Sequence, residues 1–212
     1  MKTYQSLYIL LGLLLGSLPG SGQRFQQPYA LQLRAHNSTS GSDFRVNITR
    51  SPHTILLRYG RLDSLQNKRL HADPRYAAYF DVGSLTQQSA TEQKAAARRF
   101  LAWFEQYKVY RWDSLQVSTK QAQPFCQLLD SVYTSSAAHL ERHEENRNRL
   151  VLDGTSVELL VKTDSSPVKE ISVYAPDPVS HPLLYRLLHE ALQRYRQASP
   201  TSFLDQRYTR GY

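Results

Sequence analysis

The chain is poor in cysteine, glycine and long apolar runs, and each shortage excludes a class of protein. It has one cysteine, Cys126, so no internal disulfide can form and the fold must depend on its hydrophobic core. Its nine glycines form no phosphate-cradling loop, which argues against nucleotide binding. No apolar run reaches the roughly 20 residues that a membrane-spanning helix needs, so we expect no transmembrane segment.

The motifs of common hydrolases are also missing. No Gly-x-Ser-x-Gly segment could expose a nucleophilic serine. His139 and His143 have the spacing with which one face of a helix can present two ligands to a metal ion, but Leu140 stands where a zinc protease has its glutamate. The pair therefore predicts at most a bare metal site that needs a third ligand. Two solvated histidines are the simpler interpretation.

Cys126 is a weak candidate for a nucleophile. Its neighbours Phe125, Leu128 and Leu129 are apolar and predict a buried thiol. Burial raises the pKa of a cysteine and keeps it in the unreactive thiol form. We therefore expect Cys126 to be structural.

Carboxylates leave one enzymatic alternative open. The acidic residues on or beside the predicted C-terminal hairpins are Asp153, Glu158, Asp164 and Glu170. A pair of them facing one another could serve as the acid and base of glycoside hydrolysis. Spacing in the sequence cannot establish such a pair, so the default interpretation is that they occupy turns and solvated positions.

The N-terminus has the order of a secretory signal peptide over residues 1–22. Lys2 precedes an apolar run over residues 7–18, and Gly20 and Gly22 supply the small side chains of a cleavage site. We expect cleavage near Gly22. The mature protein is then secreted or periplasmic.

The chain is basic, with a formal net charge of +8 at pH 7. Its basic residues are scattered, which is typical of a solvated surface. A basic exported protein meets anionic glycans or envelope polymers before nucleic acid, so we expect no nucleic-acid partner. Four C-terminal tyrosines lie among arginines, a combination that suits glycan stacking or a protein interface as well as the edge of a core. They are Tyr185, Tyr195, Tyr208 and Tyr212.

Alternation of apolar and polar residues predicts two three-strand blocks, at about residues 29–60 and 149–174. In the second block Asp153-Gly154 has the composition of a type I′ turn, which predicts a hairpin between residues 149–152 and 155–162. Apolar stripes predict helices at about residues 89–107, 124–146 and 181–197. The first of these begins with capping-box spacing between Ser89 and Glu92.

Grouped strands and helices indicate the α+β class, with an antiparallel sheet and the helices packed on it. One domain over residues 23–198 accounts for the pattern, and residues 199–212 are expected to fray. Because no catalytic set can be assembled, the sequence favours an exported, non-enzymatic binding or envelope-associated protein without a cofactor. Two alternatives stay open: a hydrolase of envelope polymers with dispersed catalytic residues, and a metal-binding protein that uses His139 and His143.

Overall fold

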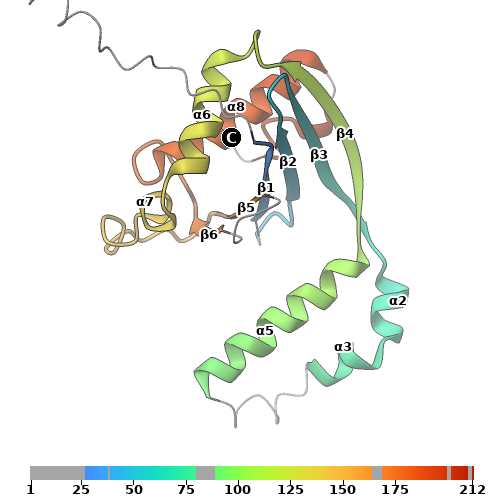
Figure 1. The fold of residues 1–212 in the computed structure, drawn as a ribbon. Helices are drawn as coiled ribbons and strands as arrows, with labels where there is room; N and C mark the ends of the chain where they lie inside the picture. The colour runs from blue at the N-terminus through green and yellow to red at the C-terminus, as the bar shows by residue number, and fades with distance from the viewer. Residues whose placement is uncertain (1–26, 38, 80–88, 164–168, 200–201, 210–211) are drawn as a thin grey trace, which may run out of the picture.

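The computed structural model describes residues 27–37, 39–79, 89–163, 169–199, 202–209 and 212, so the predicted signal peptide lies outside the described residues. One antiparallel sheet has six strands in the order β4-β3-β2-β1-β5-β6 (Figure 1). The strands are β1 (Tyr29–Asn37), β2 (Asp43–Arg50), β3 (Thr54–Leu65), β4 (Lys108–Ser118), β5 (Thr155–Lys162) and β6 (Lys169–Tyr174). The predicted α+β class with an antiparallel sheet is confirmed.

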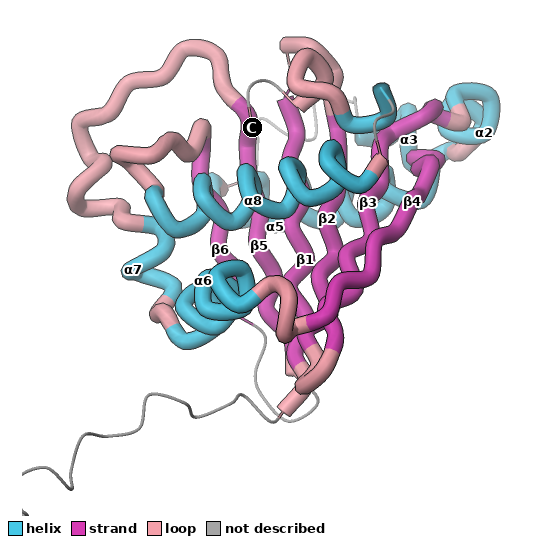
Figure 2. The backbone as a smooth tube through the Cα atoms, turned by 90° about the horizontal axis from the view of Figure 1, so that it is seen from above, coloured by secondary structure: helices cyan, strands magenta, loops and turns pink. Residues whose placement is uncertain are grey.

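One face of the sheet is covered by helices. Helices α6 (Gln123–Thr134) and α8 (Pro182–Ala198) cross this face, and the short α7 (Ala137–Glu141) lies beside β6 (Figure 2). The core between sheet and helices includes Leu33 of β1, Leu129 of α6 and Leu188 of α8, all essentially inaccessible to solvent. The strands supply this core from alternate positions, as their period of two requires. None of the described helices is both long and apolar enough to cross a bilayer.

The opposite face, called here the open face, presents the polar positions of the same alternation. Along β1, Gln32, Arg34 and His36 are half-buried or exposed, while their neighbours are buried. In Figure 2 α6 and α8 lie in front of the sheet and α5 lies behind it, on the side of the open face. In the described part of the chain, no helix packs closely on this face.

An insertion between β3 and β4, called here the arm, projects on the side of the open face (Figure 1). It contains α2 (Asn67–Ala72), α3 (Pro74–Tyr79), α5 (Ala90–Phe104) and the 3-10 turn η1 (Glu105–Tyr107). The predicted capping box of Ser89 and Glu92 begins α5. At the base, the Gln66 amide donates to the Tyr107 carbonyl over 2.9 Å. The prediction that the helix at residues 89–107 packs on the sheet is wrong, because its aromatic stripe packs within the arm.

Asp73 organises the inside of the arm. Its carboxylate accepts hydrogen bonds from the Tyr107 hydroxyl at 2.5 Å, from the Trp103 indole at 3.3 Å and from the Arg75 guanidinium at 2.7 Å. These donors hold the pKa of Asp73 far below its usual value, with the Arg75 bond as the largest cause. Phe100 of α5 stacks on Tyr79 of α3, with ring centroids 3.6 Å apart.

The helix predicted over residues 124–146 is interrupted. Ser135 is extended and ends α6, and Ser136 begins α7 by accepting a hydrogen bond from the His139 amide. Arg142, in the left-handed conformation with φ 47°, then ends α7. The serines compete for backbone hydrogen bonds and favour helix ends over helix interiors. The Lys169 ammonium adds a cap, donating to carbonyls of the last turn of α6.

The predicted hairpin at Asp153-Gly154 does not form. Residues 149–152 are a loop, because Arg149 donates to the Tyr174 and Ala175 carbonyls and to the Asp177 carboxylate, which ties the loop to the end of β6. Gly154 does not have the positive φ of a type I′ turn. A Cβ at Gly154 would lie 2.6 Å from that of Ala175, so close approach accounts for this glycine. The second block therefore has two strands, β5 and β6.

Within residues 199–212, the segment expected to fray, the described residues 202–209 and 212 lie against the domain. Phe203 and Leu204 are buried against the core, and Thr209 is inaccessible to solvent. Arg196 of α8 donates to the Leu204 carbonyl and the Thr209 hydroxyl, at 3.1 and 2.6 Å. These contacts come from single side chains and leave no periodicity in the sequence.

Candidate binding site on the open face

The open face carries a tryptophan that lies on a glycine. Trp112 of β4 is paired with Gly60 of β3, and a Cβ added to Gly60 would lie 2.9 to 3.0 Å from three atoms of the six-membered indole ring. Only glycine lets the ring come this close to the strand. Trp112 nevertheless keeps 39% of its surface exposed. A large aromatic side chain is thus held in place with part of its ring available to a ligand.

Arginine and tyrosine surround this indole and form what we call the Trp112 cluster: Trp112, Tyr110, Arg45 and Arg58. The Arg58 guanidinium carbon lies 5.4 Å from the centroid of the Trp112 ring, and that of Arg45 lies 3.9 Å from the centroid of Tyr110. The rings of Tyr110 and Trp112 are 6.0 Å apart. Arg58 is exposed and has no ion pair among the described residues. It is a cation available to an anionic ligand.

The strand register adds a further arginine. Arg34 of β1 stands directly opposite Arg45 of β2, with Glu158 of β5 on its other side. Like charges directly opposite one another on a sheet destabilise it. Arg45 reduces that repulsion through the contacts described next, while Arg34 is exposed. An anion bound beside Arg34 and Arg45 would relieve the remaining repulsion between them.

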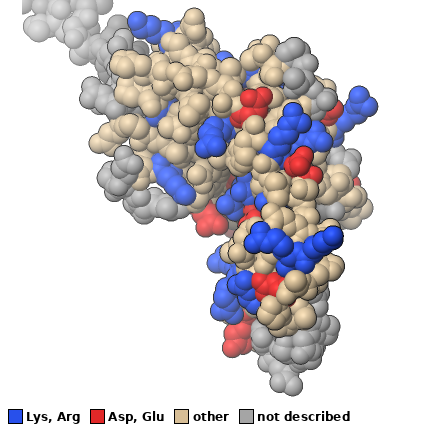
Figure 3. All heavy atoms as spheres, turned by 90° about the vertical axis from the view of Figure 1, so that its right-hand side faces the viewer, with Lys and Arg blue, Asp and Glu red and all other residues tan. Residues whose placement is uncertain are grey.

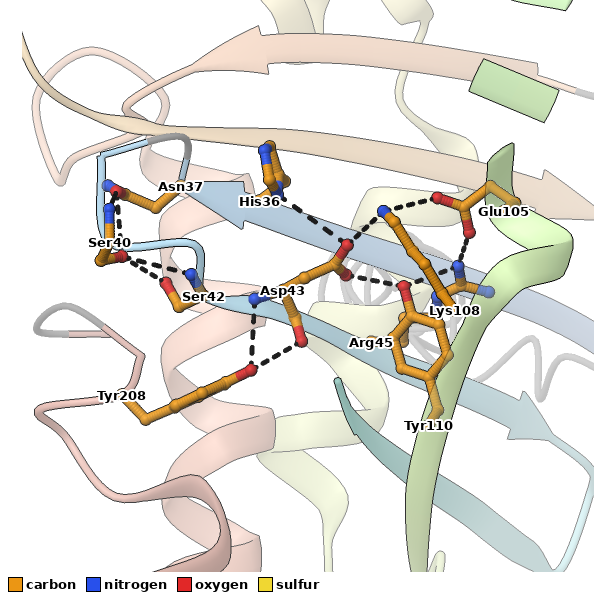
Figure 4. A network of polar contacts seen from close by, with 10 residues as sticks. All are labelled: His36, Asn37, Ser40, Ser42, Asp43, Arg45, Glu105, Lys108, Tyr110 and Tyr208. Carbon is orange, nitrogen blue, oxygen red and sulfur yellow. Dashed lines mark hydrogen bonds and ion pairs between the residues drawn. The ribbon is translucent and has the colours of Figure 1, made fainter. Parts of the chain in front are cut away.

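Side chains at the base of the arm form a closed ring of polar contacts (Figure 4). The Lys108 ammonium binds the carboxylates of Asp43 and Glu105, at 2.5 and 2.7 Å. Glu105 pairs with Arg45, which donates to the Tyr110 hydroxyl at 2.8 Å. Tyr110 donates in turn to Asp43 at 2.9 Å, closing the ring. Burial is the largest cause that raises the pKa of Tyr110 and keeps its hydroxyl protonated for this bond.

The ring is a structural element more than a reactive one. It has two carboxylates and two cations, so its formal charges cancel. It joins β2, η1 and β4, and therefore fixes the arm to the sheet. Tyr208 binds the same strand from the C-terminal segment, where its hydroxyl accepts from the Asp43 amide and donates to the Asp43 carbonyl. The ring holds Arg45 and Tyr110 in the orientation that the Trp112 cluster needs.

No family model matches the chain, and comparison with curated proteins and with solved structures finds no match.

The predicted pair of histidines does not share a helix face. His139 lies on α7, but α7 ends before His143, and Arg142 in the left-handed conformation turns the chain between them. His143 lies 3.3 Å from the Glu141 carboxylate. Among the described residues there is no group of three or more histidine, cysteine, aspartate or glutamate side chains that could hold a metal ion.

Cys126 is buried, as its neighbours predict, with 5% of its surface exposed. Burial raises the pKa of the thiol, and its sulfur lies 3.7 Å from the Thr119 carbonyl. Poor reactivity stays a prediction. We expect a thiol reagent to label the native protein far more slowly than the denatured one.

The four predicted carboxylates are not brought together as one site. Asp153 accepts from the Thr39 hydroxyl at 2.7 Å in a loop, and Asp164 lies outside the described residues. Glu158 and Glu170 do share the open face as diagonal neighbours on β5 and β6. Neither glutamate lines the clefts of about 380 and 490 Å³ near Arg149 in the described part of the chain.

The C-terminal tyrosines mainly support the core edge. The Tyr195 hydroxyl donates to Asp113 of β4 at 2.6 Å, and its ring lies 4.6 Å from that of Tyr59. Tyr212 donates to the Pro176 carbonyl and lies near Tyr185. The Trp112 cluster is not predicted from the sequence, where its one visible signal is an Arg-Trp-Asp segment without a recognised strand around it.

Proposed function

We propose that the protein is exported by cleavage near Gly22 and acts, secreted or periplasmic, as a non-enzymatic binding protein. Its ligand is an anionic glycan or envelope polymer, a sugar chain that carries carboxylate or phosphate groups. The Trp112 cluster carries this proposal. It combines an exposed indole with the free cation of Arg58 on a face that no described helix covers closely.

The chemistry of the cluster fits a charged sugar better than a neutral or purely apolar ligand. An indole offers a flat surface of considerable area for the C–H face of a sugar ring, at little cost in side-chain entropy. Arginine binds carboxylate and phosphate through paired N–H groups and stacks on aromatic rings. Figure 3 shows further lysine and arginine side chains on the side of β4, both on the arm and on the sheet body, by which we mean the six strands with α6, α7 and α8. These cations would attract a polyanion.

A binding role also fits the surroundings of the carboxylates on the open face, which are either paired with cations or exposed to water. Asp43 and Glu105 are neutralised within the ring by Lys108 and Arg45, so neither is available as a general acid or base. Glu158 and Glu170 lie on an open surface, where water competes for both carboxylates. The hydrolase alternative therefore has less support than binding.

The test uses carboxymethyl-dextran with uncharged dextran as its matched control, followed by calorimetry. The wild-type protein should bind the charged polymer, more weakly as salt concentration rises, and should release no reducing ends. Trp112→Ala and Arg58→Gln should each weaken binding about tenfold, or about 1.4 kcal/mol. Arg186→Gln is the control, because Arg186 is an exposed arginine of α8 and its loss changes the net charge equally.

Two results would overturn the proposal. One is equal binding by wild type, Trp112→Ala and Arg58→Gln, which would leave only nonspecific charge attraction. The other is tighter, Trp112-dependent binding of single-stranded DNA, since bases also stack on aromatic side chains. In that case the same surface would serve a nucleic acid.

A further inference from the structure

Strand β4 has an unpaired outer edge. It is the first strand in the sheet order, has 11 residues and pairs only with β3 among the described strands. No described strand lies beyond it in Figures 1 and 2. Such an edge presents backbone N–H and C=O groups that can pair with another strand. Natural edge strands are commonly short, interrupted by proline or protected by charged side chains; β4 is long and has no proline, and its charges are Lys108, Arg111 and Asp113.

The backbone direction along this edge is shown by Ser114. Its N–H group donates to the neighbouring Asp113 carboxylate over 2.8 Å, which places this N–H on the outer side of β4. Inward and outward backbone groups alternate along a strand, so Trp112 and Tyr110 also direct their N–H and C=O groups outward. A partner strand must therefore place its own outward-directed residues opposite these.

The charged side chains on either side of Trp112 can complement those of a second copy of β4. Arg111 precedes Trp112 and Asp113 follows it, both on the helix-covered side of the sheet. If two copies of β4 pair antiparallel with Trp112 opposite Trp112, each Arg111 stands opposite Asp113 of the second copy. A shift by two residues places Arg111 opposite Arg111, or Asp113 opposite Asp113. Charge therefore favours a single central register.

We propose that two copies of this chain associate through their β4 edges in that register. The two sheets then form one continuous sheet, with both open faces on the same side and the two Trp112 clusters at its centre. The Asp113 carboxylate releases the Ser114 N–H to the second copy and accepts Arg111 of that copy in exchange. Tyr195 continues to donate to Asp113 and holds it beside the edge. This association is independent of the proposed ligand.

Charge-swap variants of the full chain test the proposal by sedimentation equilibrium at micromolar concentrations. The wild type should have about twice the mass of a single chain. Arg111→Asp and Asp113→Arg should each be monomeric, because each places like charges opposite one another twice. Their equimolar mixture should regain the dimer, since every pair is then opposite in sign. Circular dichroism checks that each variant is folded, because Asp113→Arg also removes the bond from Tyr195.

A second pair of variants tests the backbone and does not depend on charge. Ser114→Pro removes an outward N–H that the sheet itself does not use, so the fold should persist and the dimer should weaken at least tenfold. Ser114→Ala is the matched control and should remain dimeric. A monomeric wild type would overturn the proposal, as would dimers that persist in Arg111→Asp and Ser114→Pro. Failure of the mixture to dimerise would overturn the register.

Discussion

In the sheet body, α6 and α8 bury leucine and valine side chains against the sheet, whereas α5 of the arm has no fully buried side chain among those described. The arm buries Leu70 of α2 and otherwise depends on stacked aromatic rings, on Asp73 and on the ring of polar contacts at its base. Apolar burial is cooperative over many residues, while a few polar contacts can open locally. We therefore expect the arm to open before the body unfolds.

The largest effect should come from the core of the body. Leu188→Ala removes a fully buried side chain of α8 and should lower the free energy of unfolding by about 2 to 5 kcal/mol. Leu101→Ala on the arm is the matched control, because Leu101 is 59% exposed, and its effect should stay within about 0.5 kcal/mol. Urea denaturation measures both. Equal midpoints for the two variants would contradict the contrast between body and arm.

Gly60→Val should have the next largest effect. A Cβ at this position meets the Trp112 ring at 2.9 Å, so either the indole moves or the two strands separate. We expect a loss of about 1 to 3 kcal/mol in denaturation and a changed tryptophan fluorescence spectrum. In a Trp112→Ala background the same substitution should cost clearly less. An equal loss of unfolding free energy in both backgrounds would mean that the position of the Trp112 indole does not require a glycine at residue 60.

Acid should weaken the body at a higher pH than the arm. Burial is the largest cause that lowers the pKa of His181, whose ring nitrogens contact the Ser180 hydroxyl and the Glu141 carbonyl, at 2.9 and 3.0 Å. The unfolded state therefore binds a proton more readily below about pH 6.5, and stability of the body should fall from there. The denaturation midpoint at pH 8 and pH 5 measures this. His181→Asn should reduce the difference between the two values.

The arm should keep its own acid-sensitive contact to lower pH. The lowered pKa of Asp73 means that its contribution is complete above the ordinary aspartate value of 3.8 and is lost as pH falls through the lowered pKa. A lower denaturation midpoint of the body at pH 5, without any opening of the arm, would support the prediction that acid weakens the body first. Arm opening near pH 6, detected by hydrogen exchange of α5, would contradict it.

Removing Asp73 should have the smallest effect on global stability and a clear effect on the arm. Asp73→Ala deprives Tyr107, Trp103 and Arg75 of their shared acceptor. We expect limited proteolysis to cut the arm several times faster while the urea midpoint of the body stays unchanged. Asp205→Ala, which alters the C-terminal segment, is a control that should leave the cleavage rate of the arm as in the wild type. A fall in the urea midpoint of the body for Asp73→Ala would show that arm and body unfold together.

Much of the sheet body could be predicted from the sequence because its strands and helices each have one apolar face and one polar face. The alternation of β2 and the apolar stripe of α8 report burial directly. β4 could not be predicted, since it is an edge strand whose exposed centre gives no clean alternation. At residues 149–152 the apolar residues Leu150 and Leu152 predict a strand, but both side chains are exposed in a loop.

The candidate site was beyond sequence reasoning for a different reason. The ring joins Asp43 and Arg45 to Glu105, Lys108 and Tyr110, and the arm separates the two groups along the chain. Neither group has a recognisable spacing of its own. Gly60 and Trp112 are likewise joined only by the pairing of β3 with β4. These contacts depend on the strand register, which a single sequence does not specify without a recognised β4.

The arm leaves and re-enters the sheet at adjacent points, because Gln66 and Tyr107 are joined by a backbone hydrogen bond. It is thus an insertion in a β-hairpin whose ends already meet, and the entropy of closing the hairpin depends only weakly on what lies between them. The inserted segment can therefore be exchanged: a short turn or a different domain could replace the arm between residues 66 and 107 while β3 and β4 keep their register. The sheet can therefore act as a constant scaffold, and the arm is the part of this molecule that can diversify without refolding the rest.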